Sequence, residues 1–150
     1  MKKLTLFSFI IFTVSVFSQT PSVAEGDKIL GTWLTGSGNA HIKITKYGES
    51  KYGGKIVWLK DPKRADGTIK NDDKNPDKAK QANTIMGLNN LLGFTYSGNK
   101  SYEGGSIYDP ENGKTYKCVM TLDDDNTLKV RGYVGIQMLG RTDLWKRVTE

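Results

Sequence analysis

Apolar and polar residues alternate with a period of two along most of the chain after residue 27, which is the pattern of half-buried β-strands. In residues 40–46, Ala40, Ile42 and Ile44 share one face, and His41 lies on the other. Successive side chains of a strand point to opposite faces, so one face is expected to be buried and the other wet. The strands that this pattern predicts cover residues 29–34, 40–46, 52–59, 92–96, 101–108, 115–122, 127–134 and 139–148.

About eight antiparallel strands in roughly 120 residues indicate an all-β domain, either a closed barrel or a sandwich. Glycines within or beside the strands, such as Gly53, Gly54 and Gly132, favour the barrel because glycine permits bends and bulges at barrel corners. We therefore expect a single antiparallel, roughly eight-stranded barrel, which is just wide enough to hold one small ligand. The one helix that the sequence predicts is a short helix within residues 78–92.

Residues 60–83 lack the alternation and are rich in turn-forming and charged residues. Loops of this length are uncommon in a compact domain and often serve as lids or binding loops. Two interpretations stay open, a lid over one end of the barrel and a solvated linker between two strands.

Residues 1–18 form a separate segment, with a basic start at Lys2 and Lys3 followed by an apolar run. As a helix, this run spans about 21 Å, which is short of a bilayer core of ~30 Å. We expect a cleaved secretory signal peptide at 1–18, a short lead at 19–28 and the barrel domain at 29–150, in the periplasm or outside the cell. A membrane-tethering helix is the alternative, whereas cleavage leaves no stable membrane span.

Composition narrows the chemistry of the chain. Its net charge of +6 comes from lysines spread among acids, which does not indicate a nucleic-acid partner. The single cysteine, Cys118, cannot form an intrachain disulfide and is expected to face inward as an apolar filler. The spacing of Asp73, Asn75 and Asp77 imitates a calcium loop but lacks its glycine and glutamate. We expect no metal or cofactor, and we assume a monomer.

The sequence contains no clear set of catalytic residues. A nucleophilic triad would need His41, the one histidine, which alternates outward. The carboxylates of Glu103, Asp109, Glu111 and Asp143 could converge in space, so an enzyme stays open as a third hypothesis. We predict no catalytic residues.

Aromatic residues near the two ends of the barrel sequence indicate structural roles. Trp33 lies in the first predicted strand, and Arg141, Trp145 and Arg147 lie in the last. An early tryptophan can plug one end of a barrel, with a late arginine across its ring in a cation–π contact. We assign structural roles to Gly31, Trp33, Arg141 and Trp145.

Several segments together resemble a family of exported bacterial proteins, the domain of unknown function 2147 family. The segments that carry this resemblance are 31–33, 53–57, 72–77, 87–88, 104–110, 113–116, 128–133 and 140–145. The resemblance covers almost all of the chain after residue 30 and implies a lipocalin-like (calycin-type) barrel. It implies no established activity.

Our leading hypothesis is an exported, non-enzymatic barrel that binds a small hydrophobic or amphipathic ligand. Inward-facing candidates for its binding site are Ile42, Ile44, Ile56, Trp58, Tyr116, Met120 and Val130. Tyr108, Asp109 and Arg131 are candidates for a polar rim, although the segment around Asp109 can equally maintain a hairpin turn. The alternative is a solid barrel that binds an envelope protein or a glycan through its loops or outer face.

Overall fold

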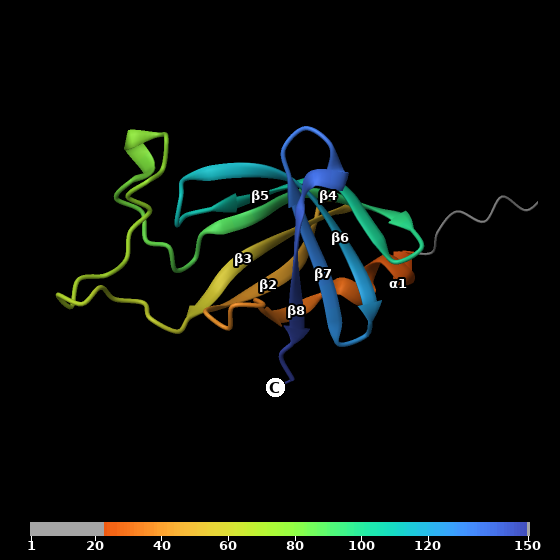
Figure 1. Cartoon of the computed structure of the whole chain (residues 1–150). Helices are drawn as coiled ribbons and strands as arrows, with labels where there is room; N and C mark the ends of the chain where they lie inside the picture. Colours follow the sequence, from red (N-terminus) through yellow and green to blue (C-terminus); the bar gives the residue numbers. More distant parts are fainter. Residues whose placement is uncertain (1–22, 150) are drawn as a thin grey trace, which may run out of the picture.

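The computed structural model describes residues 23–149, which form a closed eight-stranded antiparallel barrel (Figure 1). The signal peptide expected at 1–18 and the first residues of the lead lie outside the described residues. The elements are α1 (Val23–Gly26), η1 (Asp27–Ile29), β1 (Gly31–Leu34), β2 (Ala40–Tyr47), β3 (Lys51–Leu59), η2 (Lys78–Lys80), β4 (Asn89–Gly98), β5 (Ser101–Asp109), β6 (Lys114–Asp124), β7 (Thr127–Tyr133), η3 (Gln137–Leu139) and β8 (Arg141–Arg147).

Each strand pairs with its neighbours in sequence, and β8 returns to pair with β1, so the predicted all-β barrel is confirmed. The helix expected within residues 78–92 is reduced to the single 3-10 turn η2, and β4 already begins at Asn89. Ile29, expected in the first strand, lies instead in the 3-10 turn η1, where its side chain is fully buried.

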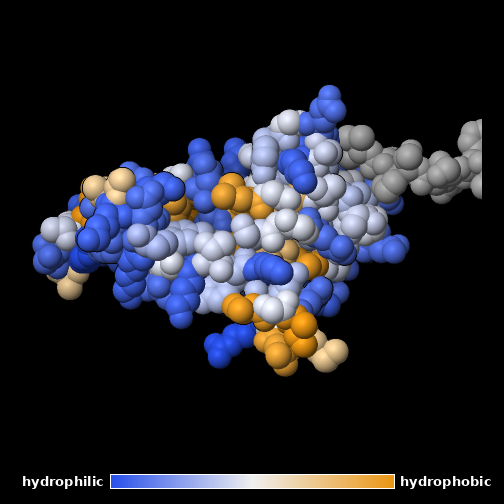
Figure 2. All heavy atoms as spheres, turned by 90° about the horizontal axis from the view of Figure 1, so that it is seen from above, coloured by the Kyte–Doolittle hydropathy of each residue, from blue (hydrophilic) through white to orange (hydrophobic). Residues whose placement is uncertain are grey.

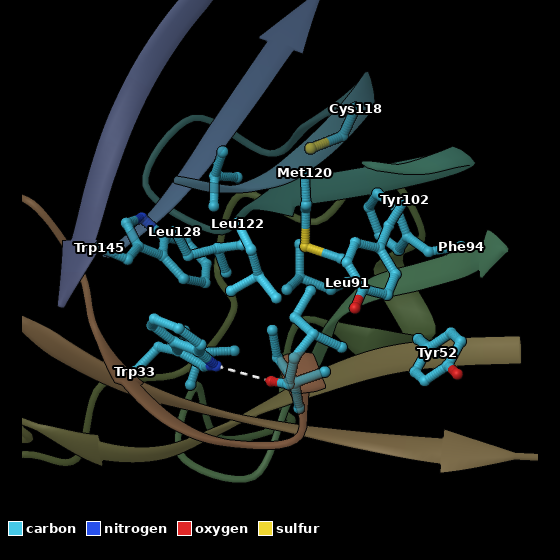
Figure 3. Packing of buried hydrophobic residues seen from close by; sticks show 14 of the residues in the cluster. Trp33, Tyr52, Leu91, Phe94, Tyr102, Cys118, Met120, Leu122, Leu128 and Trp145 are labelled. Atoms are coloured by element: carbon cyan, nitrogen blue, oxygen red, sulfur yellow. Dashed lines mark hydrogen bonds between the residues drawn. The ribbon is translucent and has the colours of Figure 1, made fainter. Parts of the chain in front are cut away.

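The interior of the barrel is packed with apolar side chains, many of which Figure 3 shows in contact across the barrel. The core includes Ile42, Ile44, Ile56, Met120 and Val130, each at most 3% exposed, as the alternation predicts. Cys118 is buried too, at 1% exposed, which confirms its role as an apolar filler. Burial of this apolar surface is the main force that closes the barrel.

Trp58 is the exception, because the expectation that it faces inward is wrong. A bulge interrupts the pairing of β2 with β3, so that His41 opposes Trp58 while Ile42 opposes Ile56. One extra residue therefore lies on β3, and Val57 and Trp58 both point outward, 40% and 39% exposed. Outside the barrel, the Trp58 ring packs on the imidazole of His41 at 4.4 Å between centroids.

One end of the barrel is closed by the segment α1–η1. The buried Trp33 indole donates a hydrogen bond of 2.9 Å to the Ile29 carbonyl. The Arg147 guanidinium lies 4.2 Å from the Trp33 ring centroid and donates to the carbonyls of Lys28 and Leu30. The predicted cation–π device is therefore present, but Arg147 supplies it. Arg141, which is among the residues with predicted structural roles, is exposed at the opposite end of β8.

The other, open end of the barrel receives the connections β1–β2, β3–β4, β5–β6 and β7–β8, because consecutive strands run in opposite directions. The longest of these connections, residues 60–88, extends from the barrel body, and the β7–β8 connection projects in a different direction (Figure 1). Across residues 23–149, the structure contains no helix with the length and apolarity needed to cross a membrane.

Candidate functional site

A cavity of about 750 Å³ lies at the open end of the barrel, above the packed core. Its apolar lining comes mainly from barrel strands and includes Ile42, Ile56, Ile107 and Trp145. Its polar lining comes mainly from the connecting loops and from the ends of strands. The cavity therefore has an apolar floor and a polar rim, an arrangement typical of small-molecule sites.

The predicted interior residues divide between the cavity and the core. Ile42 and Ile56 line the cavity, whereas Ile44, Met120 and Val130 belong to the packed core and are absent from its lining. Within the barrel, the space for a ligand is thus confined to the mouth, because side chains fill the remainder of the interior.

Tyr116 and Trp58 also lie outside the cavity lining. Tyr116 pairs with Ile107 but is half-buried, and its hydroxyl accepts a 3.0 Å hydrogen bond from Asn112 Nδ2 in the β5–β6 turn. Tyr116 lies on the same face of β6 as Cys118, as the alternation predicts. It is near the end of the strand, however, and contacts the β5–β6 turn rather than the core.

Of the three residues expected in the polar rim, Tyr108 and Asp109 line the cavity. Asp109 also caps its own hairpin turn, since its carboxylate accepts from the Glu111 N–H at 2.9 Å and from Asn112 Nδ2 at 2.8 Å. Asp109 therefore both lines the cavity and holds the β5–β6 turn. Arg131 is not part of the rim, because it lies on the outer side of β7 and binds carbonyls of the β7–β8 loop.

Several residues of segment 60–88, among them Asp61, Arg64 and Lys70, form one wall of the cavity, while most of the segment is exposed to solvent. Two isolated bridges, Lys63–Ile69 and Asn71–Thr84, order this segment internally. An ion pair between Arg64 and Asp73 ties its two arms together. Sequence alone left the role of this segment open because it lacks any hydrophobic period.

Asp72 attaches this wall to the barrel. Its carboxyl group is fully buried and accepts hydrogen bonds from the Tyr108 hydroxyl at 2.6 Å and from Asn75 Nδ2 at 2.7 Å. Burial and the neighbouring Asp72 raise the pKa of Tyr108 to about 12, so its hydroxyl remains a hydrogen-bond donor at neutral pH. In the sequence, Asp72 appears only within the family-like segment 72–77 and as one acidic residue among many in a turn-rich region, so its buried position could not be predicted.

Asn90 is the second residue whose position the sequence did not predict. It lies at the start of β4, lines the cavity and is only 7% exposed. Among the residues that the structure describes, its Oδ1 atom finds no hydrogen-bond donor. A buried polar atom without a partner costs about 1–3 kcal/mol, so this acceptor is suited to a donor group from a molecule in the cavity.

The carboxylates considered as catalytic candidates converge only in part. Asp109, Glu111 and Asp143 line the cavity, whereas Glu103 lies on β5 and accepts from the Ser101 hydroxyl. The Asp143 carboxylate accepts hydrogen bonds from the Gly36 N–H at 3.2 Å and from the Trp145 indole N–H at 2.7 Å. Within residues 23–149, no three His, Cys, Asp or Glu side chains are grouped so that they could hold a metal ion.

Comparisons with known proteins agree with this architecture. A family model described as "Uncharacterized protein conserved in bacteria (DUF2147)" matches residues 31–147. Among solved structures, the chain is similar to protein HP1028 from Helicobacter pylori, which is described as belonging to the lipocalin family. The two are 21% identical, with a TM-score of 0.69 over 81% of this chain and 84% of that protein. This likeness shows a shared fold. Comparison with curated proteins finds no match.

Proposed function

We propose that this chain, which belongs to the bacterial family of uncharacterized proteins DUF2147, binds one small amphipathic molecule in the cavity at the open end of its lipocalin-like barrel. The proposal is a binding role without a chemical step. It is supported by the engagement of Asp109 and Asp143 in structural hydrogen bonds, which leaves them poorly placed to act as acid and base.

The observation that carries the proposal is the combination of an apolar floor with one orphaned acceptor. Ligand cavities typically enclose ~300–1,000 Å³ and combine apolar lining with a few placed polar groups. The apolar part of a ligand would contact Ile42, Ile56 and Trp145. A hydroxyl, amide or amine of the ligand would donate to Asn90 Oδ1, which removes the cost of burying that atom unpaired.

Export is part of the proposal, since residues 1–18 have the composition of a secretory signal. The ligand would then be met in the periplasm or outside the cell. The mixed charge at the rim, with Arg64, Lys70 and Asp109 around an apolar floor, suits a molecule whose polar end stays near solvent.

The test uses the chain from Gln19 and N-phenyl-1-naphthylamine, an apolar fluorescent probe with one N–H donor. We expect one probe per chain, by fluorescence titration and native mass spectrometry. Asn90→Leu should weaken binding about tenfold, which is the loss of one buried hydrogen bond. Ile107→Asn in the cavity should weaken it as well, whereas the control Val57→Asn on the outer face should not.

Two outcomes would contradict the proposal. The first is no uptake of the probe, and no mass of a co-purified molecule on the protein isolated from a bacterial periplasm. The second is probe binding that Asn90→Leu, Ile107→Asn and Val57→Asn all leave unchanged, since the probe would then lie elsewhere. Thermal unfolding of each variant checks that the barrel remains folded.

A further inference from the structure

The β7–β8 connection, residues 134–140, presents four large apolar side chains to solvent. Val134, Ile136, Met138 and Leu139 are 74%, 59%, 82% and 77% exposed. Figure 2 shows an apolar cluster projecting from one edge of the molecule. Exposed apolar side chains are ordinary when scattered, but a contiguous cluster usually marks an interaction site. None of these residues lines the cavity, so this feature is independent of the proposed ligand site.

The loop is held in shape by Arg131. Its guanidinium donates to the carbonyl oxygens of Gln137 and Met138, both at 2.9 Å, and to the Thr142 hydroxyl at 2.7 Å. These bonds fix the backbone of the 3-10 turn η3 and direct its apolar side chains away from the barrel. The cluster is therefore preorganised, which lowers the entropic cost of binding.

Cationic residues lie at the base of the loop. Arg131 lies beneath it and donates to the carbonyl oxygens of Gln137 and Met138. Lys117 pairs with Tyr133 at the base of the loop, and Arg141 follows directly after it. An apolar tip with aromatic and cationic residues at its base is typical of a segment that inserts into a lipid headgroup region.

We propose that residues 134–139 insert into the interface of an anionic lipid bilayer and attach the barrel to it peripherally. A protein partner is disfavoured by shape, because a stable protein interface buries about 800 Å² on each side and four side chains on one projecting loop offer much less. Shallow insertion needs only a few apolar side chains, and anionic lipids attract nearby cations by about 1 kcal/mol each.

The test measures co-sedimentation of the chain from Gln19 with vesicles of 70% phosphatidylcholine and 30% phosphatidylglycerol, at low and at physiological salt. We expect binding that falls at least tenfold with pure phosphatidylcholine vesicles. The variant Met138→Ser/Leu139→Ser should lose binding at least tenfold. The matched control Ile69→Ser/Met86→Ser removes two exposed apolar side chains from another loop and should bind as the parent chain does.

A second measurement reports on insertion itself. Cys118 is buried, so a thiol-reactive environment-sensitive dye can be placed selectively at Met138→Cys, with Ile69→Cys as the control. Vesicles should shift the emission of the dye at position 138 to the blue and leave the dye at 69 unchanged. Equal binding by both serine variants, or no shift at position 138, would overturn the proposal. Pulldown of a protein through the loop without vesicle binding would overturn it too.

Discussion

The Tyr108 hydroxyl donates a 2.6 Å hydrogen bond to Oδ1 of the fully buried Asp72, across a sequence separation of 36 residues. This contact joins the end of β5 to the long segment 60–88. Tyr108 itself lines the cavity, and so do Asn71 and Asp73, the two neighbours of Asp72. The cavity therefore depends on an attachment between a barrel strand and a loop that has little regular structure of its own.

Tyr108→Phe should loosen that attachment. The substitution keeps the ring but leaves Asp72 Oδ1 buried without its donor, at a cost of about 1–3 kcal/mol. Because the barrel core is untouched, we expect local opening of residues 71–75 rather than global unfolding. Hydrogen exchange in that segment should accelerate, and the fluorescent probe should bind more weakly.

Tyr47→Phe serves as the control for Tyr108→Phe. The Tyr47 hydroxyl is exposed and accepts from the Gly93 N–H, away from segment 71–75. Similar exchange rates for residues 71–75 in the two variants would show that Tyr108 does not hold the wall.

Gly113→Ala should displace the same wall from the other side. Gly113 has a φ of +71°, and a Cβ there would overlap the carbonyl oxygen of Lys74, whose ammonium group also donates to the Glu111 carbonyl. Gly135 shares the positive φ, at +74°, but its Cβ would meet open space. Gly135→Ala therefore measures the backbone cost alone, about 1 kcal/mol. Urea unfolding should show a larger loss of unfolding free energy for Gly113→Ala than for Gly135→Ala. Equal losses would contradict the close contact between Gly113 and the Lys74 carbonyl.

Arg147→Lys should destabilise the closed end of the barrel. Lysine keeps the charge but cannot donate simultaneously to the carbonyls of Lys28, Leu30 and Asp125 while lying flat on the Trp33 ring. We expect a loss of roughly 2 kcal/mol in the free energy of unfolding, measured with urea. Arg141→Lys, at an exposed position of the same strand, should change it by less than about 0.5 kcal/mol.

The alternation of apolar and polar residues predicted the barrel well wherever strands are regular. It placed Ile42, Ile44, Met120 and Val130 inside, because a buried face imposes a period of two on each strand. It failed at Trp58, because a one-residue bulge reverses the facing of every later residue and leaves no mark in composition.

Polar residues were harder to place than apolar ones. Arg141 and Arg147 look equivalent in sequence, and the register of β8 against β1, which sets Arg147 opposite Trp33, distinguishes them. Asp72 and Asn90 owe their burial to contacts between distant segments. Such contacts are set by tertiary packing, so no local pattern could single out the residues that shape the cavity.

Alkaline pH should destabilise the folded barrel progressively between about pH 9 and 12. Burial raises the pKa of the Cys118 thiol from 9.0 to about 12. Burial, and then the hydrogen bond to Asp27, raise the pKa of Tyr52 from 10.0 to about 12. A group whose pKa is higher in the folded state stabilises fully below its unfolded pKa, and this contribution is lost as the pH rises through the folded value. The free energy of unfolding should therefore change little between pH 7 and 9 through these groups and then fall.

Each such group contributes a slope of up to about 1.4 kcal/mol per pH unit within its window. Urea unfolding at pH 8.5, 10 and 11 measures the slope, and Cys118→Ala removes the part that begins near pH 9. The Cys118→Ala variant should be less stable than the parent chain at pH 8.5, because the smaller side chain leaves a void in the core. Its free energy of unfolding should nevertheless fall less between pH 8.5 and pH 10. An unchanged slope in Cys118→Ala would mean that the thiol ionises without unfolding, and that Cys118 is less buried than its 1% exposure implies.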